Sequence, residues 1–182
     1  MTNKEIIRNS ILLCSSMLIL TAIFYLWFDI SIAHWFYGYR HTRLHDFCAN
    51  FYATLFMPAH WLFAAIVSTV CALWAKYRLG DRRMAHGCFF FAAAIFATMV
   101  IVWGLKLGLG RYRPTEYFQH QLYGFSWLST KYATHSMPSG HSATAFAGFY
   151  SISLLWRRSW LTVLAWLLAS SVAMSRLMAG AH

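Results

Sequence analysis

Long apolar runs separated by short clusters of basic residues extend along the whole chain. Ile11–Phe28 and Met84–Leu105 contain 18 and 22 residues without a charge, and a helix needs about 20 mostly apolar residues to cross a bilayer. The pattern predicts an all-α integral membrane helical bundle, formed by a single membrane-embedded domain over residues 1–182. Its five transmembrane helices are expected near residues 10–28, 53–75, 86–107, 140–156 and 159–178.

The composition favours the same class of protein. Hydrophobic residues make up 59% of the chain and charged residues only 11%, whereas a soluble domain carries about 25% charged residues. Buried helices of a soluble core are the alternative, and so many apolar runs in one short chain disfavour it. The first run is longer than the roughly 7–15 apolar residues of a secretory signal, and no small-residue cleavage site follows it. We therefore interpret it as a retained anchor.

The basic residues lie at the ends of the predicted spans. A net charge of +10 could indicate a protein that binds nucleic acid. The chain has no single basic patch with interleaved aromatics, however, so no nucleic-acid partner is expected. The short loops 76–83 and 157–158 are dense in Lys and Arg, which is typical of cytoplasmic loops. We expect a multi-pass protein of a bacterial inner membrane with a cytoplasmic N-terminus. The longer loops 30–50 and 108–138 then lie on the periplasmic face.

The first of three polar clusters on that outer face is KLGLGRYRP, at the end of the third predicted span. Lys106 and Arg113 are seven positions apart, which returns to nearly the same face of a helix. Pro114 disfavours helical geometry at Arg113, so we expect the helix to fray there. Taken by itself, Lys106 could be an ordinary basic residue at a span end whose long side chain reaches back to the membrane surface. Together with Arg111 and Arg113, it indicates an anion site.

The second cluster is PSGH, at the start of the fourth predicted span. Ser139 is expected to cap the helix, and Gly140 lets a ligand approach the backbone closely. The free N–H groups and the positive dipole end of a helix N-terminus suit phosphate. His141 lies in the first turn of this helix.

The third cluster is SRLMAGAH, at the end of the fifth predicted span. Arg176 is the informative residue, because a charge so close to an apolar span is expensive and indicates a functional role. Ser175 and His182 are seven positions apart and share a helix face. Arg176 and His182 are six apart, so an ideal helix separates them by roughly 120°. The length of Arg or a distortion near Gly180 is needed to bring both to one pocket.

The three clusters combine one Lys, two Arg, two His and a Ser–Gly turn on one membrane face. Because no carboxylate lies among them, we expect neither a divalent metal nor a cofactor. Arginine matches phosphate oxygens bidentately, lysine adds a point charge, and histidine can act as a nucleophile or transfer protons. The sequence therefore predicts a phosphate site.

The order K-x6-R-P, P-S-G-H and S-R-x5-H resembles the type 2 phosphatidic acid phosphatase superfamily, whose membrane lipid phosphatases are related to vanadium haloperoxidases. The match covers residues 106–182. It implies a metal-independent lipid phosphatase that hydrolyses a phosphomonoester or diphosphate headgroup through a phosphohistidine intermediate. By this resemblance His182 is the nucleophile and His141 is the general acid and then the general base. The residues that hold the phosphoryl oxygens would be Lys106, Arg113, Ser139, Gly140 and Arg176.

Members of this superfamily continue past the last histidine with an aspartate four residues on, which orients the ring, and then with a sixth span. This sequence ends at His182. The resemblance therefore implies that the domain is incomplete at its C-terminus and that a sixth helix is missing after residue 182. By the same resemblance, full activity is not expected of residues 1–182 alone.

Two other functions remain open at this stage, a lipid phosphotransferase using the same pocket and a non-catalytic protein that binds anionic headgroups. The partners expected in every case are the bilayer and a phosphorylated membrane lipid. Candidates for that lipid are undecaprenyl diphosphate, phosphatidylglycerol phosphate, phosphatidic acid and a lipid A phosphate. His41 and His45, beside Asp46, could form a metal pair, but a solvated interfacial loop is the better interpretation. The oligomeric state is not predicted.

Overall fold

The computed structural model describes residues 3–180 and divides the chain into two compact units, Met1–Gly38 and Tyr39–His182. The predicted all-α fold is confirmed. Over residues 3–180 the structure is helical and holds no strand, apart from an isolated β-bridge between Arg111 and Phe125.

The first unit consists of α1 (Asn3–Trp27) and α2 (Asp29–Tyr37). The stretches Ser15–Trp27 and Asp29–Tyr37 are bent by 61° relative to each other, and together they are long and apolar enough to form one broken span. Large apolar side chains such as Leu18 and Leu26 are exposed on α1. Such a surface is suited to contact with lipid rather than with water.

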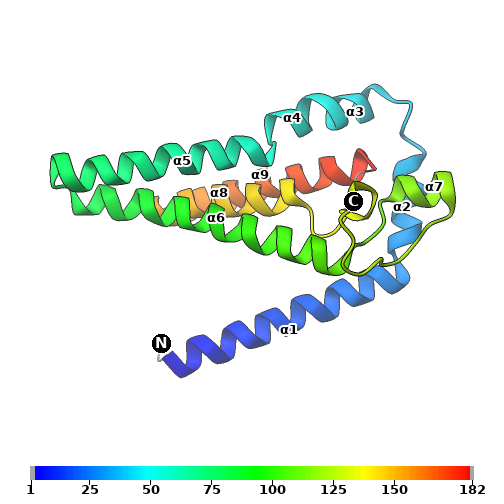
Figure 1. Cartoon of the computed structure of the whole chain (residues 1–182), viewed down its shortest axis with the longest axis horizontal. Coiled ribbons are helices and arrows are strands. Elements are labelled where there is room, and N and C mark those ends of the chain that lie inside the picture. Colours follow the sequence, from blue (N-terminus) through cyan, green and yellow to red (C-terminus); the bar gives the residue numbers. More distant parts are fainter. Residues whose placement is uncertain (1–2, 181–182) are drawn as a thin grey trace. The chain divides into compact units, whose positions relative to one another are not determined.

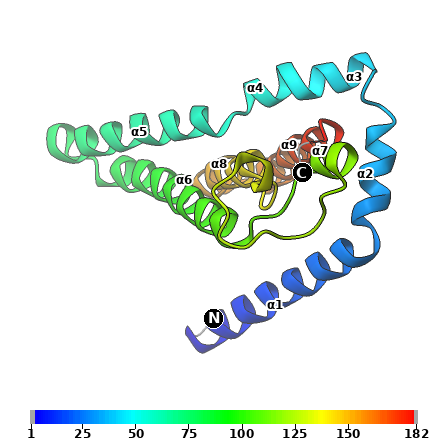
Figure 2. The ribbon, with the colours of Figure 1, turned by 45° about the vertical axis from the view of Figure 1, so that its right-hand side comes forward.

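The second unit contains four long helices that run side by side, with shorter segments at their ends (Figures 1 and 2). In chain order its elements are α3 (Arg43–Asp46), the π-helical η1 (Phe47–Tyr52), α4 (Ala53–Leu55), α5 (Pro58–Trp74), the π-helical η2 (Ala75–Leu79), α6 (Arg82–Leu109), α7 (Pro114–His120), the 3₁₀ turn η3 (Tyr132–Thr134), α8 (Gly140–Trp156) and α9 (Ser159–Met178). α5 packs against α6, α6 against α8, and α8 against α9.

Local sequence signals fix the ends of α5 and α6. Pro58 is the first residue of α5, where its missing N–H costs nothing, and Met57 before it is extended (φ −60°, ψ 138°). The predicted span 53–75 is therefore interrupted before Pro58. Gly80 adopts a left-handed conformation (φ 67°), and the Asp81 carboxylate accepts a hydrogen bond from the Met84 N–H at 2.9 Å to begin α6.

Three helical stretches of the described chain are long and apolar enough to cross a membrane, Arg43–Leu79, Arg82–Leu109 and Ser159–Met178. The bent pair of the first unit makes a fourth if it counts as one span. α8 has 17 residues, at the lower limit for a spanning helix. The membrane character of the bundle is thus supported, and the predicted number of five transmembrane helices stays a prediction.

Small residues form the contacts between the long helices. The fully or nearly fully buried small residues are Ala65, Ala72, Ala92, Ala145, Gly148 and Ala169. A few larger side chains, such as Ile95 and Val172, are buried with them, but many others point outward, and Phe63 and Val100 are 68% and 73% exposed. This distribution is expected in lipid, where close backbone approach drives helix association because apolar burial does not.

Gly148 on α8 lies directly against Trp61 of α5. A Cβ at this position would overlap the six-membered ring of Trp61 on α5. The Trp61 ring cannot move freely, because it packs edge-on against Phe149 with the ring centroids 5.0 Å apart. The glycine is therefore required by packing between the helices.

Gly148→Ala should destabilise the bundle by about 1–3 kcal/mol, the usual cost of overpacking a core. Thermal unfolding in detergent measures this effect. The matched control is Gly104→Ala on α6, where an added Cβ meets no atom within 4 Å, so its stability should be unchanged or raised. Adding Trp61→Leu to Gly148→Ala should recover part of the loss. A Gly148→Ala protein as stable as the unmodified one would contradict this packing.

Candidate active site

The end of α6 is determined by Gly110, three residues before Arg113. Gly110 is left-handed (φ 58°, ψ 43°), and its N–H donates to the Lys106 carbonyl at 3.0 Å. A Cβ on Gly110 would overlap the carbonyl oxygen of Ser126. The chain therefore leaves the helix after Leu109. The helix ends before Arg113, as expected, but it does so already at Gly110, so Arg113 lies outside α6 and shares no helix face with Lys106.

Arg113 is held by the segment around η3. It is non-helical (φ −77°, ψ 151°), as Pro114 predicts, and stands immediately before α7. Its backbone N–H donates to the Ala133 carbonyl at 3.0 Å, and its Nε donates to the Tyr132 carbonyl at 3.2 Å. The guanidinium carbon lies 4.0 Å from the centroid of the Tyr132 ring. Tyr132 was not predicted from the sequence, because no motif or spacing connects it to Arg113.

The N-terminus of α8 meets the end of α6. Ser139 caps α8 as predicted, since its Oγ accepts a hydrogen bond from the Ser142 N–H at 3.4 Å. Gly140 is buried, and a Cβ on it would lie 3.9 Å from the Nζ of Lys106 and 3.6 Å from the Cγ of Pro58. The ammonium group of Lys106 thus reaches the first turn of α8.

The short segment before α5 supports His141. The His141 side chain, half-buried on α8, lies beside the backbone of Ala53 on α4. The neighbouring Tyr52 hydroxyl is hydrogen-bonded to the Ser171 hydroxyl of α9 at 2.5 Å. η1 and α4 therefore tie α8 to α9 next to the predicted catalytic histidine. The sequence shows only an apolar run here, which carries no signal for this role.

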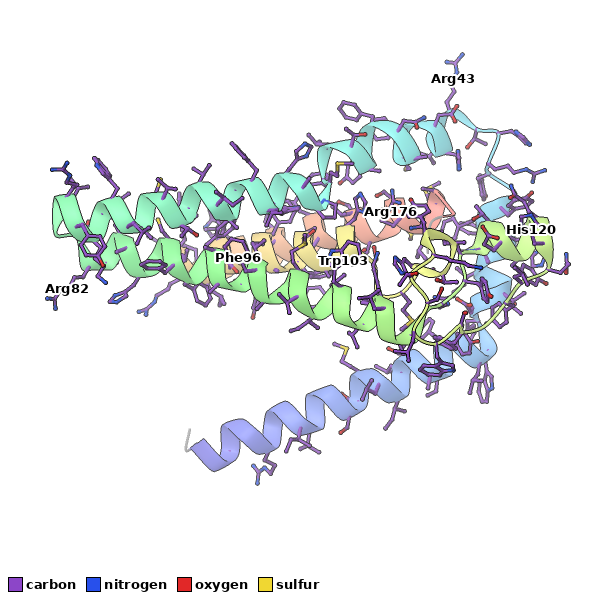
Figure 3. The ribbon with its side chains drawn as sticks, in the orientation of Figure 1. Arg43, Arg82, Phe96, Trp103, His120 and Arg176 are labelled. Carbon is purple, nitrogen blue, oxygen red and sulfur yellow. The ribbon has the colours of Figure 1, made fainter. Side chains whose placement is uncertain are left out.

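Arg176 lies in the last turn of α9 at the same end of the bundle, close to the loop between α6 and α8 (Figure 3). Its Nε is buried and has no hydrogen-bond partner among the described residues. The charges of Arg113 and Arg176 act on Lys106, and all three cations act on His141. Among residues 3–180, no ion pair joins this cluster to a carboxylate. Such an uncompensated cluster fits an anion.

The structure thus brings five of the predicted residues to one end of the bundle, Lys106, Arg113, Gly140, His141 and Arg176. Ser139 lies beside them, with its Oγ occupied by capping. His182 lies outside the described residues.

The alternative metal site was the pair His41 and His45 beside Asp46. In the structure, His45 Nδ1 lies 3.6 Å from Asp46 Oδ1. Over residues 3–180, no three His, Cys, Asp or Glu side chains gather closely enough to hold a metal ion. Among the described residues, His41, His45 and Asp46 therefore do not form a three-ligand group.

Fold and site together define an α-helical membrane-type protein with a cluster of cationic side chains at one end of its bundle. The sequence model of the PAP2 superfamily matches residues 87–182, more than half of the chain and all of these clusters. The chain belongs to the PAP2 superfamily.

A characterised relative is the lipid A 1-phosphatase of Rhizobium etli, 33% identical over 96 residues. The match covers 53% of this chain and 40% of the relative, so the chain spans well under two thirds of that protein. No solved structure matches the chain significantly.

Tyr132→Leu should weaken the binding of vanadate, a phosphate analogue, by about 2- to 5-fold, the value of an exposed cation–π contact. The reason is that the leucine removes the ring beneath the Arg113 guanidinium. Tyr132→Phe keeps the ring and should bind within about twofold of the unmodified protein. Calorimetric titration in detergent gives both affinities. Equal losses in the two variants would show that the hydroxyl, and not the ring, matters.

Proposed function

We propose that the protein is a lipid phosphatase that removes a phosphomonoester or diphosphate headgroup through a phosphohistidine intermediate. The observation that carries the proposal is the convergence of Lys106, Arg113 and Arg176 on His141, with the Nε of Arg176 buried and unpaired among the described residues. Membership of the PAP2 superfamily and the lipid A 1-phosphatase relative support it.

In the first step, an imidazole nitrogen of His182 attacks the phosphorus atom. The N–P bond forms while the bond from phosphorus to the lipid oxygen breaks, and His141 gives its proton to the leaving oxygen. Lys106, Arg113 and Arg176 hold the phosphoryl oxygens, on which negative charge is spread during transfer. The Ala53 backbone lies beside the ring of His141 and can orient it for this transfer.

In the second step, His141 takes a proton from water, and the resulting nucleophile attacks the phosphorus of phosphohistidine. The N–P bond breaks, which returns His182 and releases phosphate. The same group thus serves as acid and then as base, which is typical of histidine. A phosphotransferase would differ only in the acceptor that replaces water.

The substrate is a lipid in the membrane that surrounds the bundle. The cluster lies where α6, α8 and α9 meet at one membrane face, so a headgroup can enter while its acyl chains stay in the bilayer. We place this face in the periplasm, because the short basic loops at the other end favour the cytoplasm. The name of the relative puts a lipid A phosphate first among the lipids to test.

The direct test is release of inorganic phosphate by the purified full-length protein from four lipids, a lipid A phosphate, undecaprenyl diphosphate, phosphatidylglycerol phosphate and phosphatidic acid. Arg176→Gln should lower kcat/KM by at least about 100-fold, because it removes a charged phosphate contact from a buried site. A phosphorylated acceptor lipid in place of free phosphate would identify a phosphotransferase. Neither product from any lipid would contradict the proposal.

Replacing His182 and replacing His141 should reduce phosphatase activity in different ways. His182→Ala should abolish phosphate release from every substrate. His141→Ala should lower turnover roughly 10²–10⁴-fold on a lipid alkoxide leaving group, and much less on a nitrophenyl phosphate, whose leaving group needs no proton. Turnover of both variants on both substrates measures this. Equal losses everywhere would show that the roles are misassigned.

Phosphate release should continue in excess chelator, because lysine and arginine supply the positive charge that magnesium or zinc provides in other phosphatases. The measurement is initial rate after dialysis against EDTA, with a magnesium-dependent phosphatase as the control. Activity lost in EDTA and restored by a divalent ion would contradict a metal-independent reaction.

A further inference from the structure

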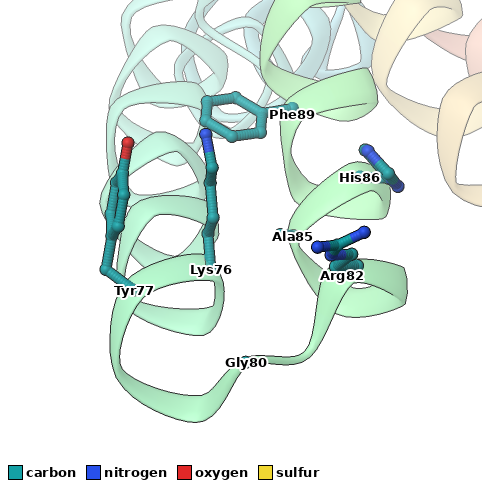
Figure 4. A pocket seen from close by; sticks show the side chains of 7 residues that line it. All are labelled: Lys76, Tyr77, Gly80, Arg82, Ala85, His86 and Phe89. Atoms are coloured by element: carbon teal, nitrogen blue, oxygen red, sulfur yellow. The ribbon is translucent and has the colours of Figure 1, made fainter.

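A second basic site lies at the opposite end of the α5–α6 hairpin. Side chains of η2 and the start of α6 line a cavity of about 660 Å³ there (Figure 4). Its lining residues are Lys76, Tyr77, Gly80, Arg82, Ala85, His86 and Phe89. Three of the seven carry nitrogen donors that can contact an anion, and no carboxylate lines the cavity. The nearby Asp81 caps α6 instead.

The cavity is separated from the candidate active site by the thickness of a membrane. Arg82 begins α6 and Lys106 lies in its last turn, which places them about 36 Å apart at roughly 1.5 Å per residue. The hydrocarbon core of a bilayer is about 30 Å thick. Figure 3 shows Arg82 and Arg176 toward opposite ends of the bundle. The cavity therefore faces the headgroups of the other leaflet.

The two kinds of side chain in the cavity match the two parts of a lipid headgroup region. Lys76, Arg82 and His86 offer hydrogen bonds and positive charge to a phosphate. Tyr77 and Phe89 offer aromatic surface at the depth where headgroups meet acyl chains. Lys76 Nζ also lies 4.9 Å from the centroid of the Tyr77 ring. A basic pocket between transmembrane helices on the cytoplasmic side is a general setting for anionic lipids.

We infer that this cavity binds the headgroup of an anionic phospholipid, in the leaflet opposite the active site. The lipid is a ligand and not a substrate, because among the described residues only one histidine, His86, lines the cavity, whereas the proposed reaction uses two. A bound headgroup would hold η2 against α6 and stabilise the helical hairpin.

The chain offers a matched control for the test. Lys76→Gln/Arg82→Gln removes two charges that line the cavity, and Arg78→Gln/Arg83→Gln removes two charges from the same loop that do not line it. Each full-length protein is titrated in detergent with dioleoyl phosphatidylglycerol, with dioleoyl phosphatidylcholine and with inorganic phosphate. The readouts are the unfolding midpoint and the apparent affinity.

Phosphatidylglycerol should raise the unfolding midpoint of the unmodified protein, and the other two additions should not. The double variant Lys76→Gln/Arg82→Gln should bind phosphatidylglycerol about 10- to 30-fold more weakly, while the control variant Arg78→Gln/Arg83→Gln stays within about threefold of the unmodified protein. Both variants should keep their phosphatase activity, which separates this site from the proposed reaction. Equal losses of affinity in the two variants would overturn the site, because they would show that diffuse surface charge binds the lipid. An equal effect of inorganic phosphate would overturn the lipid as its ligand.

Discussion

Mutual repulsion between three cations is the constraint on which the active end of this bundle depends. Lys106, Arg113 and Arg176 act on one another and on His141 without a carboxylate among the described residues to offset them. Two such charges about 4 Å apart repel by about 4 kcal/mol in a protein environment of intermediate polarity. Protein contacts must therefore hold the cluster together until an anion arrives, and a phosphate with its charge of about −2 then stabilises it.

Those contacts come from backbone groups and small residues rather than from counter-charges. The carbonyls of Tyr132 and Ala133 hold Arg113 outside α6, and the Lys106 ammonium lies against buried Gly140 at the start of α8. Farther along α8, Gly148 admits the Trp61 ring and sets the spacing to α5. Close packing through small residues is what a bundle in lipid has available. Here the same packing also holds the helices that carry Lys106 and Arg176 in the same bundle.

The fold class and the polar clusters could be predicted because they depend on local patterns. Apolar runs near 20 residues indicate spans, Ser139 caps α8, and Pro114 keeps Arg113 out of a helix. Fraying of the helix before Arg113 was expected, but the exact end of α6 at Gly110 was not, because it also depends on the close approach of the Ser126 carbonyl. The break before Pro58 inside the predicted span 53–75 and the positions of Tyr132 and Ala53 were missed, because no spacing rule reveals them.

A structure of the full-length protein with bound vanadate tests the central claim most directly. The account predicts vanadate among Lys106, Arg113 and Arg176, with an oxygen accepting a hydrogen bond from the Arg176 Nε and the vanadium atom next to the His182 ring. His141 should lie on the leaving-group side, beside Ala53. An Arg176 Nε paired with a protein group, and a cluster empty at saturating vanadate, would contradict the account.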